Sequence, residues 1–259
     1  MAPPAAFRVG CSGWQYKHWK GDFYPSDLPL REWLKYYARH FDTVEVNNSF
    51  YRLPPEGVFD DWRARTPAKF IFAVKASRFL THMKKLKDPE EPVERLFSRA
   101  VELRRKLGPV LYQLPRQLPK NAARLAAFLE ILPPRIKHAI EFREPSWYDD
   151  EVMELLRQHN VALCLHDMPG SEPPRLLTAR FTYIRFHGAT GRYNGAYPTG
   201  ALEEWADWLM THNVPAFAYF NNDIGGHAPR DARTLIDLLA ARQHLNRPGV
   251  NRDVPLAIG

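Results

Sequence analysis

Cysteine is scarce in this chain. Its 259 residues include two cysteines, Cys11 and Cys164, and each lies within an apolar run typical of a strand. Two such thiols provide neither a disulfide framework nor a zinc site built from thiolates. They indicate a reducing compartment, so we expect a cytoplasmic protein.

Long apolar runs are also missing. No uninterrupted stretch of about 20 apolar residues occurs, which excludes a membrane span. The opening residues Met1 to Arg8 have neither the basic start nor the apolar centre of a signal peptide. We therefore expect no leader and no membrane partner.

Several motifs of cofactor, metal and hydrolase sites do not occur. The chain has no G-x-G-x-x-G turn for a dinucleotide, no H-x-x-x-H or H-x-H pair for a metal, and no G-x-S-x-G for a serine hydrolase. We expect no cofactor and no metal. A metal held by His187, Glu45, Glu141 and Asp167 is the weaker alternative.

The charge that is present is unevenly distributed. Lys and Arg number 36 against 29 Asp and Glu, and residues 63–120 alone hold fifteen basic and five acidic residues. Such a flank could contact phosphates, so nucleic-acid binding or processing is one alternative function. A solvated helix face with ordinary surface charges explains the same pattern.

Apolar runs typical of strands recur along the chain about every 30 residues, the length of one strand–helix unit. We predict eight strands: Phe7–Cys11, Thr43–Val46, Phe70–Val74, Val110–Leu114, His138–Phe142, Val161–His166, Phe181–His187 and Ala216–Phe220. Eight such units predict an α/β fold, a single (β/α)8 TIM-type barrel with a parallel eight-stranded sheet.

Helical periodicity fills several of the intervals between strands. Residues 30–41, 93–100, 202–209 and 232–239 carry apolar side chains at helical spacing. Three prolines between Asp167 and Arg180 leave little room for a sixth helix, so we expect it to be irregular or very short. The barrel domain spans residues 7–245, between a flexible start (residues 1–6) and a C-terminal tail (246–259).

Polar or ionisable residues end each predicted strand, at the face where TIM barrels place their active sites. The predicted catalytic residues are Glu45, Lys75, Glu141, Asp167 and His187. Predicted substrate-binding residues at the same ends are Ser12, Asn47, Gln113, Arg143, Arg185, Asn221 and Asn222. The alternative is an ion-pair network that only plugs the barrel end.

Strand geometry assigns these side chains to faces, because residues two apart on a strand share a side. The pairs Glu45 and Asn47, Glu141 and Arg143, and Arg185 and His187 should therefore point the same way. His166 and Asp167 are adjacent, so at most one of them faces the barrel axis.

Two glycine-bearing loops follow the last two strands. They contain Gly188, Gly225, Gly226 and His227. Glycines let backbone N–H groups approach an anion, and TIM barrels often bind phosphate in these loops. We add these four residues to the predicted substrate site, although tight turns explain the glycines equally well.

The loop between Ser12 and Pro29 carries five aromatic residues. We predict that most of them form a satellite core that fixes the loop. Trp14 lies nearest the strand end and is predicted to be a wall of the ligand site.

The chain resembles the YecE-like family, known as domain of unknown function 72. The matching motifs, in chain order, are Gly10–Trp14, Phe23–Pro25, Val44–Asn47, Phe70–Lys75, Thr81–His82, Gln113–Pro115, Glu141–Arg143, Ser146–Trp147, Arg185–Gly188 and Tyr219–Asn222. The resemblance implies a TIM-type barrel and assigns no activity. Trp147, from one of these motifs, joins the predicted substrate-binding set.

These observations predict an enzyme, a hydrolase, lyase or isomerase, that performs acid/base chemistry on a small, polar, anionic and sugar-like substrate bearing phosphate or carboxylate. Glu45 or Glu141 would be the base, with a pKa tuned by Lys75 and the arginines. Lys75 could instead form a Schiff base. A ligand-binding barrel without catalysis is a further alternative, and the oligomeric state is left open.

Overall fold

The computed structural model describes residues 6–171 and 173–245, and eight strands occur in it. They are β1 (Phe7–Cys11), β2 (Thr43–Val46), β3 (Ile71–Lys75), β4 (Leu107–Gln113), β5 (His138–Glu141), β6 (Ala162–Asp167), β7 (Thr182–Phe186) and β8 (Ala216–Phe220). Three match the predicted bounds, and the others differ from them by at most three residues at either end. The predicted TIM-type barrel is confirmed.

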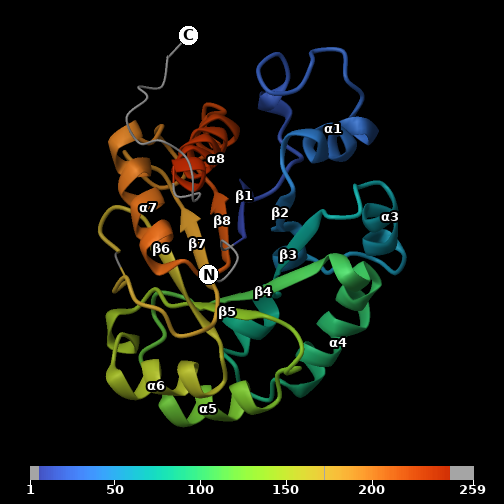
Figure 1. Ribbon diagram of the computed structural model, residues 1–259. Coiled ribbons are helices and arrows are strands. Elements are labelled where there is room, and N and C mark those ends of the chain that lie inside the picture. Colours follow the sequence, from blue (N-terminus) through green and yellow to red (C-terminus); the bar gives the residue numbers. More distant parts are fainter. Residues whose placement is uncertain (1–5, 172, 246–259) are drawn as a thin grey trace.

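The strands form one parallel sheet in the order β1-β8-β7-β6-β5-β4-β3-β2 (Figure 1). The edges that meet are therefore β1 and β2, and an isolated parallel bridge between Ser12 and Glu45 joins them. The hydroxyl of Tyr37 also lies in this seam. It accepts from the Cys11 amide at 2.7 Å and donates to the Thr43 carbonyl at 3.1 Å. The Tyr37 side chain thus takes the place of backbone hydrogen bonds between β1 and β2 where the barrel closes.

Gly10 explains how the two edge strands come so close. A Cβ atom at this position would lie 2.3 Å from the Thr43 carbonyl oxygen and 2.8 Å from the Tyr37 hydroxyl. Only glycine fits between these groups, so the sequence permits the seam at this point.

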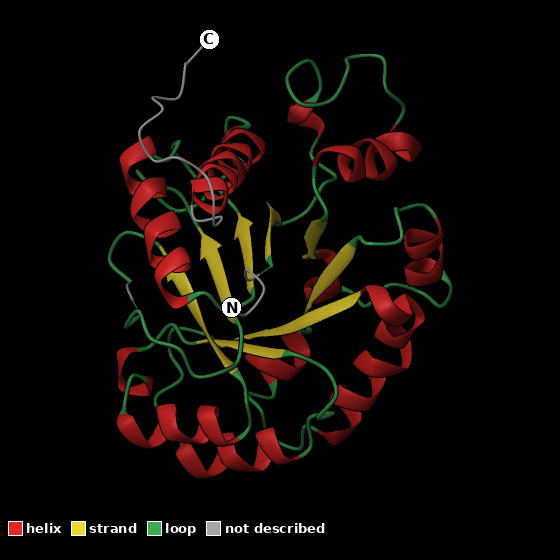
Figure 2. Cartoon of the chain, viewed as in Figure 1, coloured by secondary structure: helices red, strands yellow, loops and turns green. Residues whose placement is uncertain are grey.

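The helices surround the strands on the outside (Figure 2). They are α1 (Trp33–His40), α2 (Asn48–Tyr51), α3 (Val58–Ala64), α4 (Glu90–Ala100), α5 (Ala122–Glu130), α6 (Asp150–Gln158), α7 (Thr199–His212) and α8 (His227–Leu245). Further helical turns of other types are Lys17–Trp19, Leu30–Glu32, Phe79–Met83, Val101–Lys106 and Pro145–Trp147. Within residues 168–171 and 173–181 no helix joins β6 to β7, in agreement with the three prolines.

Apolar side chains are buried on both sides of the strands. The large outer cluster lies between strands and helices; for example, Val93, Leu96 and Phe97 of α4 are buried in it. The smaller inner cluster consists of Ala73, Leu111, Ala139, Ala162, Cys164, Phe181, Tyr183, Phe217 and Tyr219. It fills the barrel, so the polar residues that follow these positions gather at its C-terminal end.

The loop after β1 forms the predicted satellite core. The Tyr24 ring stacks on that of Trp33 with centroids 4.7 Å apart, and Phe23 contacts Trp19 and Tyr24 edge to face. These contacts attach the loop to α1. The predicted terminal segments lie outside the described residues, except Ala6, whose carbonyl accepts from the Ala216 amide.

In the described part of the chain, no helix combines the length and apolar character needed to cross a membrane.

Candidate functional site

Arg185 of β7 is the centre of a charged cluster at the C-terminal mouth of the barrel. Its side chain is fully buried. Its guanidinium donates to Glu45 Oε2 at 2.9 Å and to Glu141 Oε2 at 2.8 Å. One cation from β7 thus joins carboxylates from β2 and β5. The pKa of Arg185 stays well above its ordinary value, because the two carboxylates outweigh the desolvation that opposes its charge.

Glu141 has a second basic partner, Arg143, with which it forms a close ion pair. Burial opposes the ionisation of Glu141, but Arg143 and Arg185 outweigh it and hold the pKa of this carboxyl well below its usual range. Arg143 also donates to His187 Nε2 at 2.8 Å and lies 3.0 Å from the Met168 sulfur. Burial lowers the pKa of His187 well below its ordinary value, so the imidazole is neutral and accepts this bond.

Ser12, Asn47 and Tyr183 surround the Glu45 carboxylate and its neighbours. The Ser12 hydroxyl donates to Glu45, the Tyr183 hydroxyl donates to Glu45 Oε1 at 2.8 Å, and the Asn47 amide donates to Ser12 Oγ at 2.5 Å. Glu45 is fully buried. Its charge is therefore balanced by Arg185 and by two hydroxyl donors.

Lys75 differs from the other charged residues of the mouth. Within residues 6–171 and 173–245, its Nζ atom forms no hydrogen bond or ion pair, and it lies 4.2 Å from the centre of the Phe50 ring. The residue is 8% exposed. Desolvation, followed by repulsion from Arg185, lowers the pKa of Lys75 from 10.5 to about 7. This amine therefore changes its charge near neutral pH.

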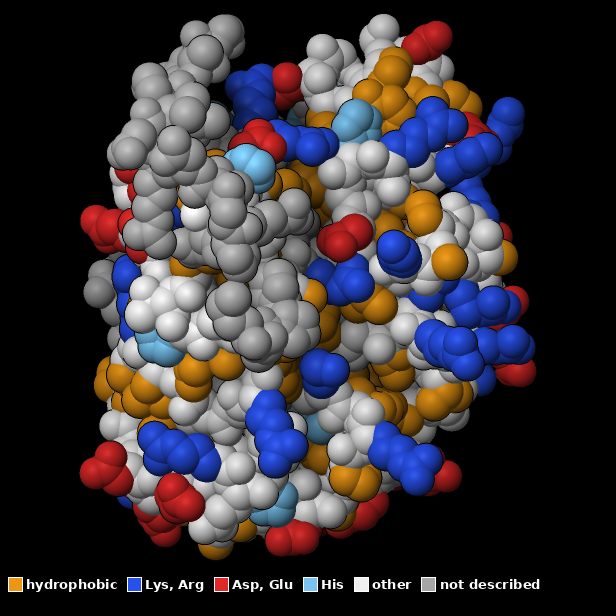
Figure 3. Space-filling view, in the orientation of Figure 1, with side chains coloured by type: hydrophobic (Ala, Val, Ile, Leu, Met, Phe, Trp, Pro, Cys, Tyr) orange, Lys and Arg blue, Asp and Glu red, His pale blue; other side chains and the backbone are white. Residues whose placement is uncertain are grey.

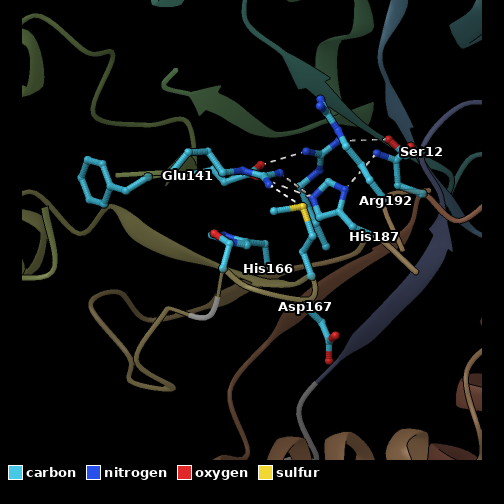
Figure 4. Close-up of polar contacts among 12 residues, drawn as sticks. Ser12, Glu141, His166, Asp167, His187 and Arg192 are labelled. Atoms are coloured by element: carbon cyan, nitrogen blue, oxygen red, sulfur yellow. Dashed lines mark hydrogen bonds and ion pairs between the residues drawn. The ribbon is translucent and has the colours of Figure 1, made fainter. Parts of the chain in front are cut away.

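The structure places Asp167, which the sequence predicts to be catalytic, outside the charged cluster of the mouth. Its carboxylate accepts from Trp205 Nε1 of α7 at 3.0 Å and from the Tyr197 hydroxyl at 3.3 Å. Figure 4 shows its side chain pointing away from the cluster that contains His187. The neighbouring residue, His166, faces the mouth instead, and its ring lies 6.3 Å from that of His187.

Because Asp167 lies outside the mouth, the mouth has one carboxylate fewer than predicted. Two carboxylates, Glu45 and Glu141, face three cations, Lys75, Arg143 and Arg185. The two arginines form ion pairs with these carboxylates, and the Lys75 ammonium does not. The protonated cluster therefore carries one unbalanced positive charge.

The two tryptophans predicted to contact the ligand lie elsewhere. Trp14 is buried edge to face against Trp62 of α3, with centroids 4.9 Å apart. Trp147 is buried in parallel contact with Phe142 at 4.8 Å, and its Nε1 donates to the Leu118 carbonyl at 2.6 Å. Both are core residues.

The first glycine loop, after β7, is held by contacts within itself and with Tyr197. Gly188 has a φ of 114°, and its amide donates to the Tyr197 hydroxyl at 3.1 Å. A Cβ atom on Gly188 would lie 2.2 Å from the Asn194 carbonyl oxygen, so the glycine serves to let the loop fold back on itself. In this loop, the need for a tight turn explains why the residue is glycine.

The second loop is also held by internal contacts. The Asn222 amide donates to Asp231 Oδ2 of α8 at 2.7 Å and to the Gly195 carbonyl at 2.9 Å. Cβ positions on Gly225 and Gly226 would meet the His227 ring and the Asp22 carboxylate. The Asn222 amide is therefore engaged with Asp231 and Gly195, and the Asp22 carboxylate beside Gly226 disfavours an anion at this turn.

Asn221 and Gln113 do reach the mouth. Asn221 is 7% exposed, and its amide nitrogen lies 3.3 Å from His187 Nδ1. Gln113 is half-buried at the end of β4, paired in register with Glu141. The predicted residues that converge are Ser12, Glu45, Asn47, Lys75, Gln113, Glu141, Arg143, Arg185, His187 and Asn221.

The structure adds three residues to this site. His166, Tyr183 and Met168 contact or flank the cluster. Tyr183 could have been found from the sequence, since it lies two residues before Arg185 on the same strand. Met168 follows β6 in a loop, and no periodicity marks it.

The described residues contain no group of three His, Cys, Asp or Glu side chains arranged to hold a metal ion. The metal alternative required Asp167 beside Glu45, Glu141 and His187, and Asp167 lies on the other side of the strand. The cation at the centre of the cluster is the Arg185 guanidinium.

The fold and this cluster define a TIM-type barrel whose inward charged residues meet at the C-terminal ends of the strands. The chain belongs to the family described as protein of unknown function DUF72, whose model matches residues 8–253. The resemblance inferred from the sequence is thus confirmed.

Curated relatives of the chain carry UPF0759 names. The chain is 27% identical to the YunF protein of Bacillus subtilis (strain 168) over 270 residues, 89% of this chain and 94% of that protein. It is 32% identical to the YecE protein of Escherichia coli (strain K12) over 116 residues, 44% of this chain and 43% of that protein.

Two solved structures of the same family share the fold. A protein of Thermotoga maritima has a TM-score of 0.80 and 31% identity, and the match covers 91% of this chain and 99% of that one. A protein of Enterococcus faecalis has a TM-score of 0.76 and 20% identity, covering 90% and 95% of the two chains.

Proposed function

We propose that the protein is an enzyme that performs acid/base chemistry on a small anionic substrate at the C-terminal mouth of the barrel. The observation that carries the proposal is Lys75: of the cluster cations Lys75, Arg143 and Arg185, it alone has no ion pair among the described residues. A phosphate or carboxylate group on the substrate would supply the missing negative charge.

Unsatisfied polar atoms support a ligand at the same place. Asn47 Oδ1, Arg143 Nε and His166 Nδ1 are buried and have no hydrogen-bond partner among the described residues. Most buried polar groups in native proteins are paired, so such atoms indicate groups that a ligand or water would contact. All three belong to strand ends that surround the mouth.

Lys75 is the proposed proton-transfer group. A pKa of about 7 allows its amine to accept and return a proton at neutral pH. Glu141 is poorly suited to act as the base, because Arg143 and Arg185 hold its pKa well below the usual range. We assign Glu141 and Arg185 to binding and orientation instead. The same amine could form a Schiff base with a carbonyl substrate.

The binding step is tested by calorimetric titration with inorganic phosphate, oxalate and malonate. We expect saturable binding of at least one dianion, weakened by about tenfold or more in Lys75→Met. Lys87→Met, at an exposed position, is the matched control and should bind as the parent does. Binding should also weaken as the pH rises through the pKa of Lys75, about 7. Equal binding by Lys75→Met and the parent would overturn the proposal.

The catalytic step is tested by deuterium incorporation from heavy water. A panel of hydroxy acids, keto acids and sugar phosphates is incubated with the parent protein, and mass spectrometry detects C–H exchange. We expect exchange into at least one member, lost in Lys75→Met and kept in Lys87→Met. Borohydride reduction that couples a keto acid to Lys75 would identify the Schiff-base route.

The competing explanation is that the cluster only closes the barrel end. In that case the parent protein binds no anion at the mouth, and the network matters only for stability, which Arg185→Met would lower. Binding measurements on the parent and on Lys75→Met separate these outcomes.

A further inference from the structure

We infer that the opposite, N-terminal end of the barrel carries a second binding site, for a small organic phosphate with two or more negative charges. A hollow of about 340 Å³ opens there. Its lining includes five basic side chains, Arg8, Arg104, Arg105, Arg135 and Lys137, and no acidic one. This volume lies in the usual range for small-ligand pockets.

Four of these cations have no counter-ion in the part of the chain that the structure describes. Arg104 and Arg105 come from the turn before β4, and Arg135 and Lys137 from the segment before β5; all four are exposed. Arg8 is the exception, because it pairs with Asp42 at 2.7 Å. Four unpaired positive charges around one hollow attract a multiply charged anion.

Ion pairs neutralise five other residues of the basic flank: Arg63, Arg65, Lys84, Arg99 and Lys120. Arg63 and Arg65 pair with Asp60 and Asp61 at 2.5 and 3.2 Å. Lys106 is buried and donates to the Arg63 and Thr66 carbonyls at 2.6 and 2.8 Å. Figure 3 shows many Lys and Arg side chains on the face in view. The four cations without a counter-ion among the described residues, Arg104, Arg105, Arg135 and Lys137, line one hollow. This arrangement favours a compact anion over an extended nucleic-acid backbone.

The apolar part of the lining gives the ligand a second chemical requirement. Ile71, Leu107, Ile136 and Phe217 line the hollow together with the cations. A ligand with a flat or apolar portion beside its phosphates, such as a nucleoside diphosphate, matches both parts. Phe217 belongs to the inner cluster that fills the barrel, so the apolar interior separates this hollow from the mouth at the other end.

The test uses the whole protein and calorimetric titration with pyrophosphate and with ADP. We expect saturable binding of both ligands at this hollow, in addition to any anion bound at the mouth, with ADP bound more tightly through apolar contact with its base. Arg105→Gln/Arg135→Gln should weaken both ligands by about tenfold or more. Arg104 is left unchanged, because its φ of 52° and ψ of −122° make a substitution there structurally ambiguous. Arg31→Gln/Arg39→Gln removes the same charge at exposed positions elsewhere and should bind as the parent does.

Three results would overturn this site. Neither pyrophosphate nor ADP binds; both double variants weaken binding equally, which indicates a general charge effect; or 20-residue oligonucleotides bind while the two small phosphates do not. Circular dichroism verifies that each variant is folded. The loss caused by Arg105→Gln/Arg135→Gln should be the same in a Lys75→Met background, so failure of this site and failure of the proposed mouth chemistry are distinguishable.

Discussion

The Lys75 ammonium lies 4.2 Å from the centre of the Phe50 ring. An aromatic face stabilises a cation, but less than water or a carboxylate would. Phe50 is itself nearly buried and also contacts His82, with centroids 5.1 Å apart. This aromatic contact therefore keeps water from the amine while leaving its charge unbalanced.

The first prediction concerns the titration of this amine. NMR of lysine labelled at Cε should show Lys75 titrating with a pKa of about 7, below its ordinary value of 10.5. Phe50→Ala admits water, so the pKa of Lys75 should rise toward 10.5. Lys87, which is exposed, provides the control resonance. Titration of Lys75 near 10 in the parent protein would contradict the buried, unpaired geometry.

The second prediction is the effect of Lys75→Met on the free energy of unfolding. A lysine whose folded pKa is about 7 and whose unfolded pKa is 10.5 binds fewer protons in the folded state between these values. Its contribution to stability therefore rises with pH across this window and is least favourable below it. Lys75→Met should be more stable than the parent by about 2–4 kcal/mol near pH 7. Urea unfolding measures this, and the gain should shrink toward pH 10.

The third prediction addresses Arg185, the cation shared by Glu45 and Glu141. Arg185→Met leaves two buried carboxylates without this partner and should cost about 3–5 kcal/mol of unfolding free energy. The triple variant Glu45→Gln/Glu141→Gln/Arg185→Met removes those charges and should recover much of the loss. Chemical denaturation of both proteins decides this. A mild effect of Arg185→Met alone would mean that the cluster is well hydrated.

The fourth prediction is the response to acid. Arg143 and Arg185 overcome burial to hold the pKa of Glu141 well below 4.5, so its stabilising contribution is present above 4.5 and is lost as the pH falls through its folded pKa. Glu141→Gln should be less stable than the parent at neutral pH and should lose stability less steeply below 4.5. Unfolding curves collected between about pH 3 and pH 7 compare the slopes. Parallel slopes would show that Glu141 does not control acid stability.

The fifth prediction tests the seam at Tyr37. Tyr37→Phe removes the hydroxyl that joins the Cys11 amide to the Thr43 carbonyl and should cost about 1–3 kcal/mol. The Cys11 amide should also exchange with solvent faster. Tyr36→Phe, on the same helix with a half-buried ring, should change neither quantity. Unchanged exchange at Cys11 in Tyr37→Phe would show that the backbone alone closes the barrel.

The sequence predicts the barrel and the core of its mouth because both follow from strand periodicity. Glu141 and Arg143 share a side of β5, and Arg185 and His187 share a side at the end of β7, as spacing by two requires. Their convergence needs only that the sheet closes. No knowledge of side-chain conformation was required.

Sequence periodicity could not determine which way the remaining side chains point or which residues they contact. It left His166 and Asp167 as alternatives, and the choice depends on Trp205, which lies 38 residues beyond Asp167 and binds its carboxylate. Trp14 was placed by its nearness to a strand end, but its partner Trp62 belongs to a distant helix. The glycine loops depend on contacts such as Asn222 with Asp231, which only the folded chain brings together.

The position of the seam gives the charged cluster a mechanical consequence. β1 and β2 meet where backbone bonding is sparse, and Ser12, Glu45 and Arg185 tie this edge to the centre of the barrel. The charged cluster therefore helps to hold the barrel closed at this seam. A condition that neutralises its carboxylates would let the sheet uncurl from that edge, with the outer ring of helices separating afterwards.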